Sequence, residues 1–315
     1  MMLSRTALNL YWIGRYMERA EFTARLLEAT IRLSALTRAA DPSADQSIWQ
    51  SALAVVGENE AFESTQQSFT PAAVNRFLAL SDANPNSIRS CVRGARDNAR
   101  AVRNAITREA WEAINRAWMG LNMLATPRAS QATMNFLETL TADTRGFEGA
   151  LARMLRSEAY WFIRLGSVIE RGDNTARLLD VKYFLLLPHG QQVGGPLDRD
   201  QWTTILQTVS ARNAYRLLYR DMLKPWLIAD LLILRKEMPR SLAACASETV
   251  SLLNDLASSS GRQGEADRLA RGRLTQFDTN DIERIFQSGL HEFLRRFIAE
   301  NVALDQAIAQ QFRFG

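Results

Sequence analysis

Apolar residues recur at spacings of three and four near the start of the chain, the pattern of a helix with one buried face. This first stripe comprises Leu10, Ile13, Met17, Ala20, Ala24, Leu27 and Ile31. It predicts a helix from about Ser4 to Thr37, ended by Asp41-Pro42. A second stripe has the same spacing and comprises Phe162, Leu165, Ile169, Gly172, Ala176, Leu179 and Tyr183. It predicts a helix that begins near Phe147 and stops at Pro188-His189-Gly190. Small residues on each stripe (Ala20 and Ala24; Gly172 and Ala176) would let a partner helix approach closely.

The rest of the chain carries helix signals and no convincing strand run. Helices are expected to open at Thr70-Pro71 and Lys224-Pro225, because proline fits the first turn of a helix. Two more are expected after Ser87 and Ser241, each of which can cap a helix N-terminus. The fold class is therefore predicted to be all-α.

Charge and turn patterns give the remaining expectations. One long charged helix is predicted over residues 93–118, with Arg108 and Glu112 paired on its surface. Polar loops are predicted at 37–47, 188–200 and 258–264, and a helix at 281–312. The first two loops lead into helices that carry Trp49 and Trp202 near their starts.

The segment GRYMERAEFTARLLE, which starts at Gly14, recurs as GSVIERGDNTARLLD, which starts at Gly166. The correspondence continues through Trp49 with Trp202, Pro71 with Pro225, Ser87 with Ser241 and Cys91 with Cys245. A repeat of about half the chain describes the whole fold. It predicts an internally duplicated helical bundle with two pseudo-symmetric halves, residues 1–152 and 153–315, that form one compact unit.

Composition narrows the possible functions. The net charge is +4, but basic and acidic residues alternate along the chain, whereas a nucleic-acid surface needs basic residues clustered on one face. Two isolated cysteines favour neither a disulfide framework nor a zinc site. The N-terminus lacks a signal-peptide cleavage pattern, and no apolar run is long enough to span a membrane. The sequence therefore predicts a cytoplasmic protein that binds neither nucleic acid nor membrane.

The repeated segment carries a polar motif that flanks each apolar stripe. In the first half the motif comprises Glu18, Arg19, Glu21, Thr23 and Arg25, and in the second half Glu170, Arg171, Asp173, Thr175 and Arg177. On a helix, Glu18 and Arg19 lie on opposite sides of the core-facing stripe. If the two helices pack about a pseudo-twofold axis, Glu18 can pair with Arg171 and Glu170 with Arg19.

Three interpretations of this motif are open. It is a structural ion-pair network, since a buried carboxylate needs a cationic partner. It is a binding site in which its four arginines hold a peptide or an anionic group. Or Glu18 or Glu170 is a general acid or base, which is less favoured because a neighbouring arginine lowers a carboxyl pKa.

Metal, cofactor and nucleophile chemistry find less support in the sequence. Carboxylate-rich di-metal bundles use Glu-x-x-His, and the motif has no histidine; the only histidines are His189 and His291. We therefore expect no metal and no cofactor, and catalytic residues stay unassigned. Cys91 and Cys245 are expected to be buried in helices, while Arg240, which stands where the first half has Asn86, marks a possible function of the second half alone.

Five segments occur in order along the chain: LSRTALNLYWIGRYMERAEFTARLL, NPNSI, ARDNAR, IERGDNTARLLD and PRSL. In these segments the chain resembles the alpha-E family, a bacterial all-helical domain of unknown function with a Glu-Arg motif. The resemblance covers essentially the full length. It implies gene neighbourhoods that hold a circularly permuted ATP-grasp ligase and a transglutaminase-like peptidase, some also with a proteasome-like peptidase, and a role in peptide synthesis, tagging or modification. ATP-grasp motifs are absent from this chain, so the ligation chemistry would belong to the partner.

The function expected from this resemblance is that of an accessory or substrate-presenting protein for an ATP-grasp amide ligase. Two alternatives remain. One is a stand-alone enzyme that acts on a peptide or amino-acid derivative at the duplicated Glu-Arg site, and the other is a purely structural helical scaffold. Whether the chain is an enzyme is left open.

Overall fold

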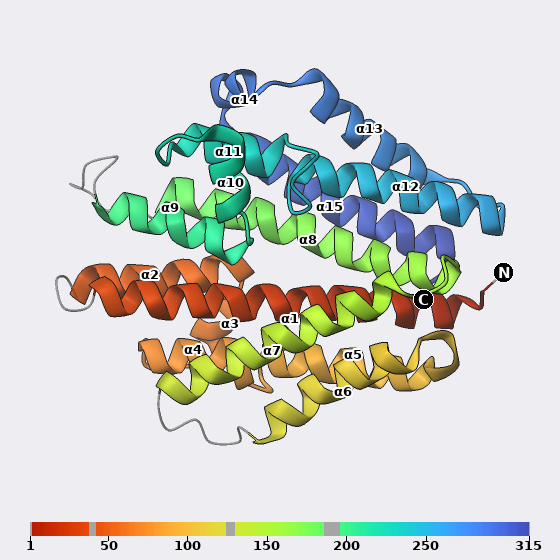
Figure 1. The fold of residues 1–315 in the computed structure, drawn as a ribbon, viewed down its shortest axis with the longest axis horizontal. Helices are drawn as coiled ribbons and strands as arrows, with labels where there is room; N and C mark the ends of the chain where they lie inside the picture. Colours follow the sequence, from red (N-terminus) through yellow and green to blue (C-terminus); the bar gives the residue numbers. More distant parts are fainter. Residues whose placement is uncertain (1, 38–41, 124–129, 186–195, 315) are drawn as a thin grey trace.

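The computed structural model describes residues 2–37, 42–123, 130–185 and 196–314 (Figure 1). Within these ranges the chain forms fifteen α-helices, one short 3₁₀ helix and no strand. The all-α prediction is confirmed. None of the helices in these ranges is long and apolar enough to cross a membrane.

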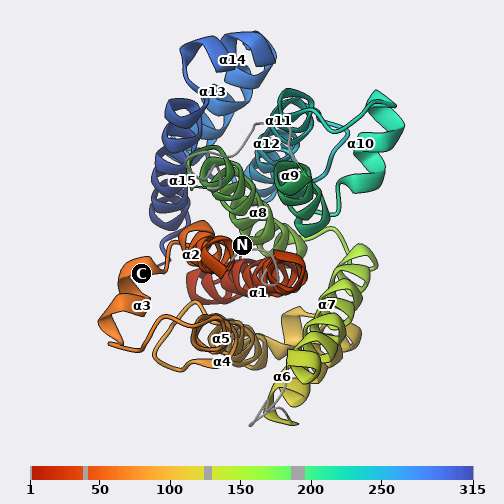
Figure 2. The same cartoon turned by 90° about the vertical axis from the view of Figure 1, so that its left-hand side faces the viewer.

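Two long helices form the centre of the molecule, α1 (Ser4–Thr37) and α8 (Glu158–Leu185). They pack against each other along much of their length, with the other helices placed around them (Figure 2). Most described residues of the two predicted apolar stripes are buried, including Leu10, Ile13, Leu165 and Ile169. The polar motif therefore lies at the centre of the fold.

The helices between α1 and α8 in the sequence are α2 (Pro42–Val56), α3 (Asn59–Ser64), α4 (Pro71–Leu80), α5 (Ile88–Ala101), the 3₁₀ helix η1 (Arg103–Ala105), α6 (Arg108–Met123) and α7 (Ser130–Ala152). Of these, α2, α4, α5 and α7 contact α1, while α3 packs on α2 and α6 packs on α5 and α7; α4 to α7 lie on the lower side in Figure 1. Helix α2 also contacts α8. A cluster of buried apolar residues, including Leu53, Phe77, Val92 and Leu137, fills the space between these helices and α1.

The helices that follow α8 pack on the opposite side. They are α9 (Pro196–Thr208), α10 (Arg212–Tyr219), α11 (Pro225–Ile233), α12 (Leu242–Ser260), α13 (Glu265–Thr279), α14 (Ile282–Ser288) and α15 (Leu290–Phe312). Of these, α12 and α15 pack most extensively on α8, and α9 also contacts α1. Buried residues such as Leu206, Ile228, Leu242 and Phe297 form the core of this side.

Several predicted helix starts are confirmed. The Thr70 side chain accepts a hydrogen bond from the Ala73 N–H ahead of Pro71. Ser87 caps α5 and Ser241 caps α12 in the same way, each accepting from the N–H three residues on. These caps satisfy backbone donors that the first turn of a helix leaves without partners.

The long helix predicted over 93–118 is wrong, because α5 ends at Ala101 and α6 begins at Arg108. Val102 and Ile106 in the turn are buried in the core, and the Thr107 hydroxyl accepts from Ala110 N to start α6. Burial of the turn therefore stabilises a break that no glycine or proline marks. The Arg108–Glu112 pair is present on the surface of α6.

The helix predicted to begin near Phe147 is also two helices, since α7 ends at Ala152 and α8 begins at Glu158. The Arg156 guanidinium donates to the carbonyls of Leu151, Ala152 and Met154, and these bonds close the end of α7.

Four boundaries near glycine or proline also differ from prediction. The helix predicted over 281–312 breaks at Gly289, whose φ of 96° favours glycine. Three loops are shorter than predicted, because α2 begins at Pro42, α9 begins at Pro196 and α12 runs on to Ser260. The predicted stop at Pro188-His189-Gly190 and Asp41 lie outside the described residues.

Candidate functional site

The backbones of α1 and α8 touch at two glycines, Gly14 and Gly166. A Cβ on Gly14 would lie 2.0 Å from the Ile163 carbonyl oxygen, and one on Gly166 would lie 2.0 Å from the Tyr11 carbonyl oxygen. Only glycine leaves room for such an approach. The glycines stand one turn before Glu18 and Glu170, so they bring the two acidic side chains to the opposing helix.

Glu18 of α1 is held by two arginines from the second half of the chain. Arg171 Nη2 and Nε donate to Glu18 Oε2 at 2.6 and 3.2 Å. Arg240, in the turn before α12, donates from Nη1 to Glu18 Oε1 at 2.5 Å. The side chains of Glu18 and Arg171 are 2% and 5% exposed, so this pair is removed from water.

Glu170 of α8 is held by two arginines from the first half. Arg19 donates from Nε to Oε1 at 2.6 Å and from Nη2 to Oε2 at 2.9 Å, the forked geometry that suits a carboxylate. Arg15 Nε donates to Oε2 at 2.6 Å. Glu170 is 4% exposed. Each buried carboxylate is thus neutralised by two arginines, at least one of them across the α1–α8 interface, and the predicted Glu18–Arg171 and Glu170–Arg19 pairs are confirmed.

Outer residues hold these arginines in turn. Arg15 donates to Asp305 Oδ1 of α15 at 2.5 Å, and Arg171 donates to Glu148 Oε1 of α7 at 2.5 Å. Arg19 donates to the Asn86 side-chain oxygen before α5. The network therefore ties the central pair of helices to elements on both sides of the fold.

The other motif residues make shorter-range contacts. Arg25 Nε donates to Glu21 Oε1 at 2.7 Å, and Arg177 Nε donates to Asp173 Oδ2 at 2.7 Å, each pair spanning one helical turn. The Glu21 carboxylate also lies 3.3 Å from Arg240. The Thr175 hydroxyl donates to the Arg240 carbonyl oxygen at 2.9 Å, and Thr23 is buried.

The electrostatic environment fixes the protonation of both glutamates. Burial alone raises the pKa of Glu18, but Arg171 and Arg240 outweigh it and lower the pKa to about 2. The same balance, with Arg19 and Arg15, lowers the pKa of Glu170 to about 2. Both oxygens of each carboxylate accept arginine hydrogen bonds. A general base needs a pKa near the working pH and a free lone pair, so neither glutamate is suited to proton transfer.

Other candidate chemical groups are also buried or occupied. Cys91 and Cys245 are buried, and burial raises the pKa of each thiol to about 12, so neither is an activated nucleophile. In the parts of the chain that the structure describes, no group of three or more His, Cys, Asp or Glu side chains could hold a metal ion. His291 Nδ1 lies 2.5 Å from Asp180 Oδ1, one turn after Arg177 on α8.

Sequence reasoning missed part of the network. Arg15 lies in the repeated segment, but its counterpart at the matched position is Ser167, so the repeat gave no reason to select it. Arg240 differs from its counterpart Asn86, and this difference was the signal that pointed to it. Asn86 and Asp305 carried no signal in the sequence.

Comparison with known proteins gives one finding. Residues 2–312 match the model of the Alpha-E family, described as a predicted alpha-helical domain with a conserved ER motif. The paired Glu18-Arg19 and Glu170-Arg171 are the two Glu-Arg dipeptides of the repeated segment. No curated protein and no solved structure matches the chain.

Proposed function

We propose that this chain, which belongs to the Alpha-E family, is a partner or substrate-presenting protein for an ATP-grasp amide ligase in a peptide synthesis or modification system. A transglutaminase-like peptidase is the second proposed partner. The Glu-Arg motif serves as the structural core that holds the protein in shape, and the contacts with partners are made at the surface.

We also infer that the chain consists of two homologous halves, 1–152 and 153–315. Reciprocal contacts support this inference. Gly14 faces the Ile163 carbonyl as Gly166 faces that of Tyr11. Arg25 donates to Ser210, and Arg177 lies against Gly57, which occupies the matched position in the other half.

The two halves differ in where the second arginine of each pair comes from. Glu170 receives it from Arg15 on the adjacent helix, where the other half has Ser167. Glu18 receives it from Arg240 before α12, where the first half has Asn86. Each carboxylate therefore has two arginine partners, although the second arginine comes from a different position in each half. This is expected if a buried carboxylate must be neutralised for the protein to fold.

The partner role rests chiefly on one observation, an exposed apolar segment at α10 and the start of α11. Leu217, Met222 and Trp226 expose 77%, 72% and 50% of their surface, and Leu218 next to Leu217 is also exposed. Large apolar side chains that are exposed close together in the chain support a protein contact at this segment. Figure 2 places α10 at the periphery of the molecule, where a partner can reach it.

Basic side chains flank the same segment. Arg216 and Arg220 are exposed on either side of the leucines. An interface typically has an apolar centre and a polar rim, and complementary charge on the rim guides association. The segment therefore suits a partner with an apolar patch and an acidic rim, and the ligase is the partner to which we assign it.

The stand-alone enzyme alternative gains no support from the motif, since both glutamates are fully engaged by arginines with pKa values of about 2. The scaffold alternative predicts no specific complex, so one binding experiment separates it from the proposal.

That experiment mixes the purified chain with the circularly permuted ATP-grasp ligase from its gene neighbourhood and analyses the mixture by size-exclusion chromatography. The wild type is expected to co-elute with the ligase. The Leu217→Ser/Met222→Ser variant should not, whereas Leu155→Ser, a control at an equally exposed leucine elsewhere, should still bind. Absence of a wild-type complex, or an unaffected double variant, would contradict the proposal.

A further inference from the structure

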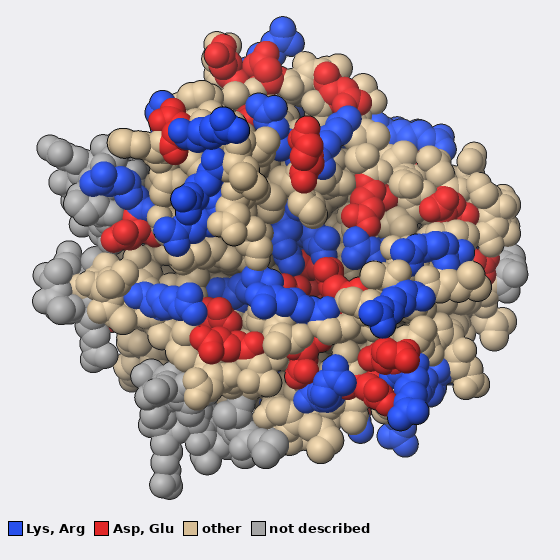
Figure 3. Space-filling model, viewed as in Figure 1, with Lys and Arg blue, Asp and Glu red and all other residues tan. Residues whose placement is uncertain are grey.

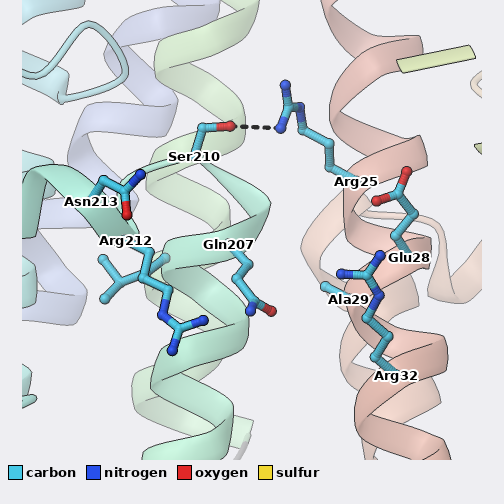
Figure 4. A pocket seen from close by; sticks show the side chains of 9 residues that line it. Arg25, Glu28, Ala29, Arg32, Gln207, Ser210, Arg212 and Asn213 are labelled. Atoms are coloured by element: carbon cyan, nitrogen blue, oxygen red, sulfur yellow. Dashed lines mark hydrogen bonds between the residues drawn. The ribbon is translucent and has the colours of Figure 1, made fainter. Parts of the chain in front are cut away.

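An open cleft of about 360 Å³ lies between α1 and the α9–α10 corner (Figure 4). One wall is α1, with Arg25, Glu28 and Arg32, and the opposite wall carries Gln207, Ser210, Arg212 and Asn213. Its volume is at the low end of the roughly 300–1,000 Å³ found for ligand pockets. No residue of the cleft takes part in the buried pairs of Glu18 and Glu170.

The cleft has an excess of positive charge, with three arginines and one glutamate. Arg212 is exposed and makes no hydrogen bond or ion pair with any described residue. Arg32 lies 3.6 Å from the exposed Glu138 of α7 and is close enough to Glu28 to interact with its charge. Arg25 is held at one end of the cleft by Glu21 and Ser210, its side chain is 12% exposed, and two of its five N–H groups make no hydrogen bond with a described residue.

The spacing of the arginines fits two carboxylates carried by one extended chain. Arg25 and Arg32 are seven residues apart on one helix, so their Cα atoms are separated by about 10 Å. A single small anion such as phosphate contacts both only if the two side chains converge on one point, whereas two separate carboxylates can each take one guanidinium. An extended peptide advances about 3.3 Å per residue and its alternate side chains lie on one face, so carboxylates two residues apart are within reach of the two arginines.

The neutral side chains of the cleft point to the same ligand class. Gln207 and Asn213 each carry a donor and an acceptor on one amide, and so can pair with both groups of a peptide bond. Figure 4 shows the Gln207 side chain directed into the gap between the two walls. Basic side chains also form a band along the middle of the face in Figure 3, over α1, which would attract an acidic chain.

We propose that this cleft binds an acidic peptide segment in extended form, with two carboxylates on Arg25 and Arg32, a further contact from Arg212, and peptide groups on Gln207 and Asn213. The cleft is separate from the exposed apolar segment at Leu217–Trp226. The inference goes beyond the partner role and does not depend on it, since the peptide can bind whether or not a ligase does.

Isothermal titration calorimetry on the full chain tests the proposal, with a short oligoglutamate peptide, the matching oligoglutamine peptide and inorganic phosphate as probes. Oligoglutamate should bind, more weakly as salt is raised, and oligoglutamine should not. Arg32→Gln and Arg212→Gln should each lower the affinity about two- to fivefold, as expected for exposed charge pairs. Glu28→Gln should raise it, because it removes the one negative charge of the cleft.

The control is Arg216→Gln, an exposed arginine one turn further along α10 that does not line the cleft. It should bind oligoglutamate like the wild type. Equal loss in Arg216→Gln and Arg212→Gln would overturn the proposal, because it would mean that only the overall charge matters. Phosphate that binds as tightly as the peptide and displaces it would also overturn it, in favour of a simple anion site. Since no ligase is present, either result leaves the partner role untouched.

Discussion

Replacing Gly14 with alanine should destabilise the protein. The added Cβ would stand 2.0 Å from the Ile163 carbonyl oxygen, whereas ordinary contacts begin at 3.4 Å. The obstacle is backbone, so no side-chain rotation relieves it, and α1 and α8 must move apart by more than an ångström. That movement would also lengthen the arginine–glutamate hydrogen bonds one turn away.

The expected loss follows from two opposing contributions. Forcing a methyl group into a packed interface costs about 1–3 kcal/mol, and the rigid obstacle here places the cost at the upper end. Alanine is more favourable than glycine inside a helix, and this difference stabilises the folded protein by about 1 kcal/mol. The free energy of unfolding should therefore fall by about 2 kcal/mol in Gly14→Ala.

The assay is urea unfolding followed by far-UV circular dichroism, with Gly272→Ala as the control. Gly272 lies within α13, and a Cβ there would meet nothing within 4 Å. It should raise the free energy of unfolding by up to about 1 kcal/mol. The two alanine variants are thus expected to shift in opposite directions. If Gly14→Ala is as stable as the wild type or more so, the close contact between α1 and α8 is not as described.

Three further predictions concern the buried charges and thiols. Arg171→Met should lower the free energy of unfolding by about 3 kcal/mol, at the low end for a buried pair because Arg240 remains on the Glu18 carboxylate. Arg177→Met, which removes a partly exposed pair, should lower it by less than about 1 kcal/mol. Urea unfolding measures both, and equal losses in the two variants would refute the prediction. Because the pKa values of Glu18 and Glu170 are lowered to about 2, their contribution to folding stability is complete above the ordinary pKa of 4.5 and is lost as pH falls through about 2. The urea midpoint should therefore drop between these pH values, and it should drop less in Glu18→Gln. An equal drop in the variant would contradict the lowered pKa of Glu18. Neither cysteine should react with a thiol reagent at neutral pH until urea unfolds the protein, because burial raises both thiol pKa values to about 12; rapid reaction of the native protein would show that a thiol is open.

The sequence predicted the structure best in α1, which carries both a long apolar stripe and the first copy of the repeated segment. The stripe from Leu10 to Ile31 predicted α1 with its correct ends, because many turns of one face repeat the same signal. Pairing of Glu18 with Arg171 followed once the repeat suggested that two equivalent helices face each other.

Other features depend on contacts between distant residues and left no local pattern. The break between α5 and α6 has no glycine or proline, and burial of Val102 and Ile106 stabilises it. Arg240 reaches Glu18 from 222 residues away. Periodicity identifies the face on which a side chain lies, but not its neighbours, so the second arginine of each pair became visible only in the structure.

The buried ion pairs of the Glu-Arg motif hold α1 against α8 and stabilise the fold. A double-mutant cycle with Glu18→Gln, Arg171→Met and the combined variant tests this claim most directly, with the free energy of unfolding as the measured quantity. We expect the combined variant to be more stable than the sum of the single losses predicts, by about 2 kcal/mol, because removing both charges leaves neither buried alone. Losses that add to within about 0.5 kcal/mol would show that the two residues do not act as a pair, and would contradict the claim.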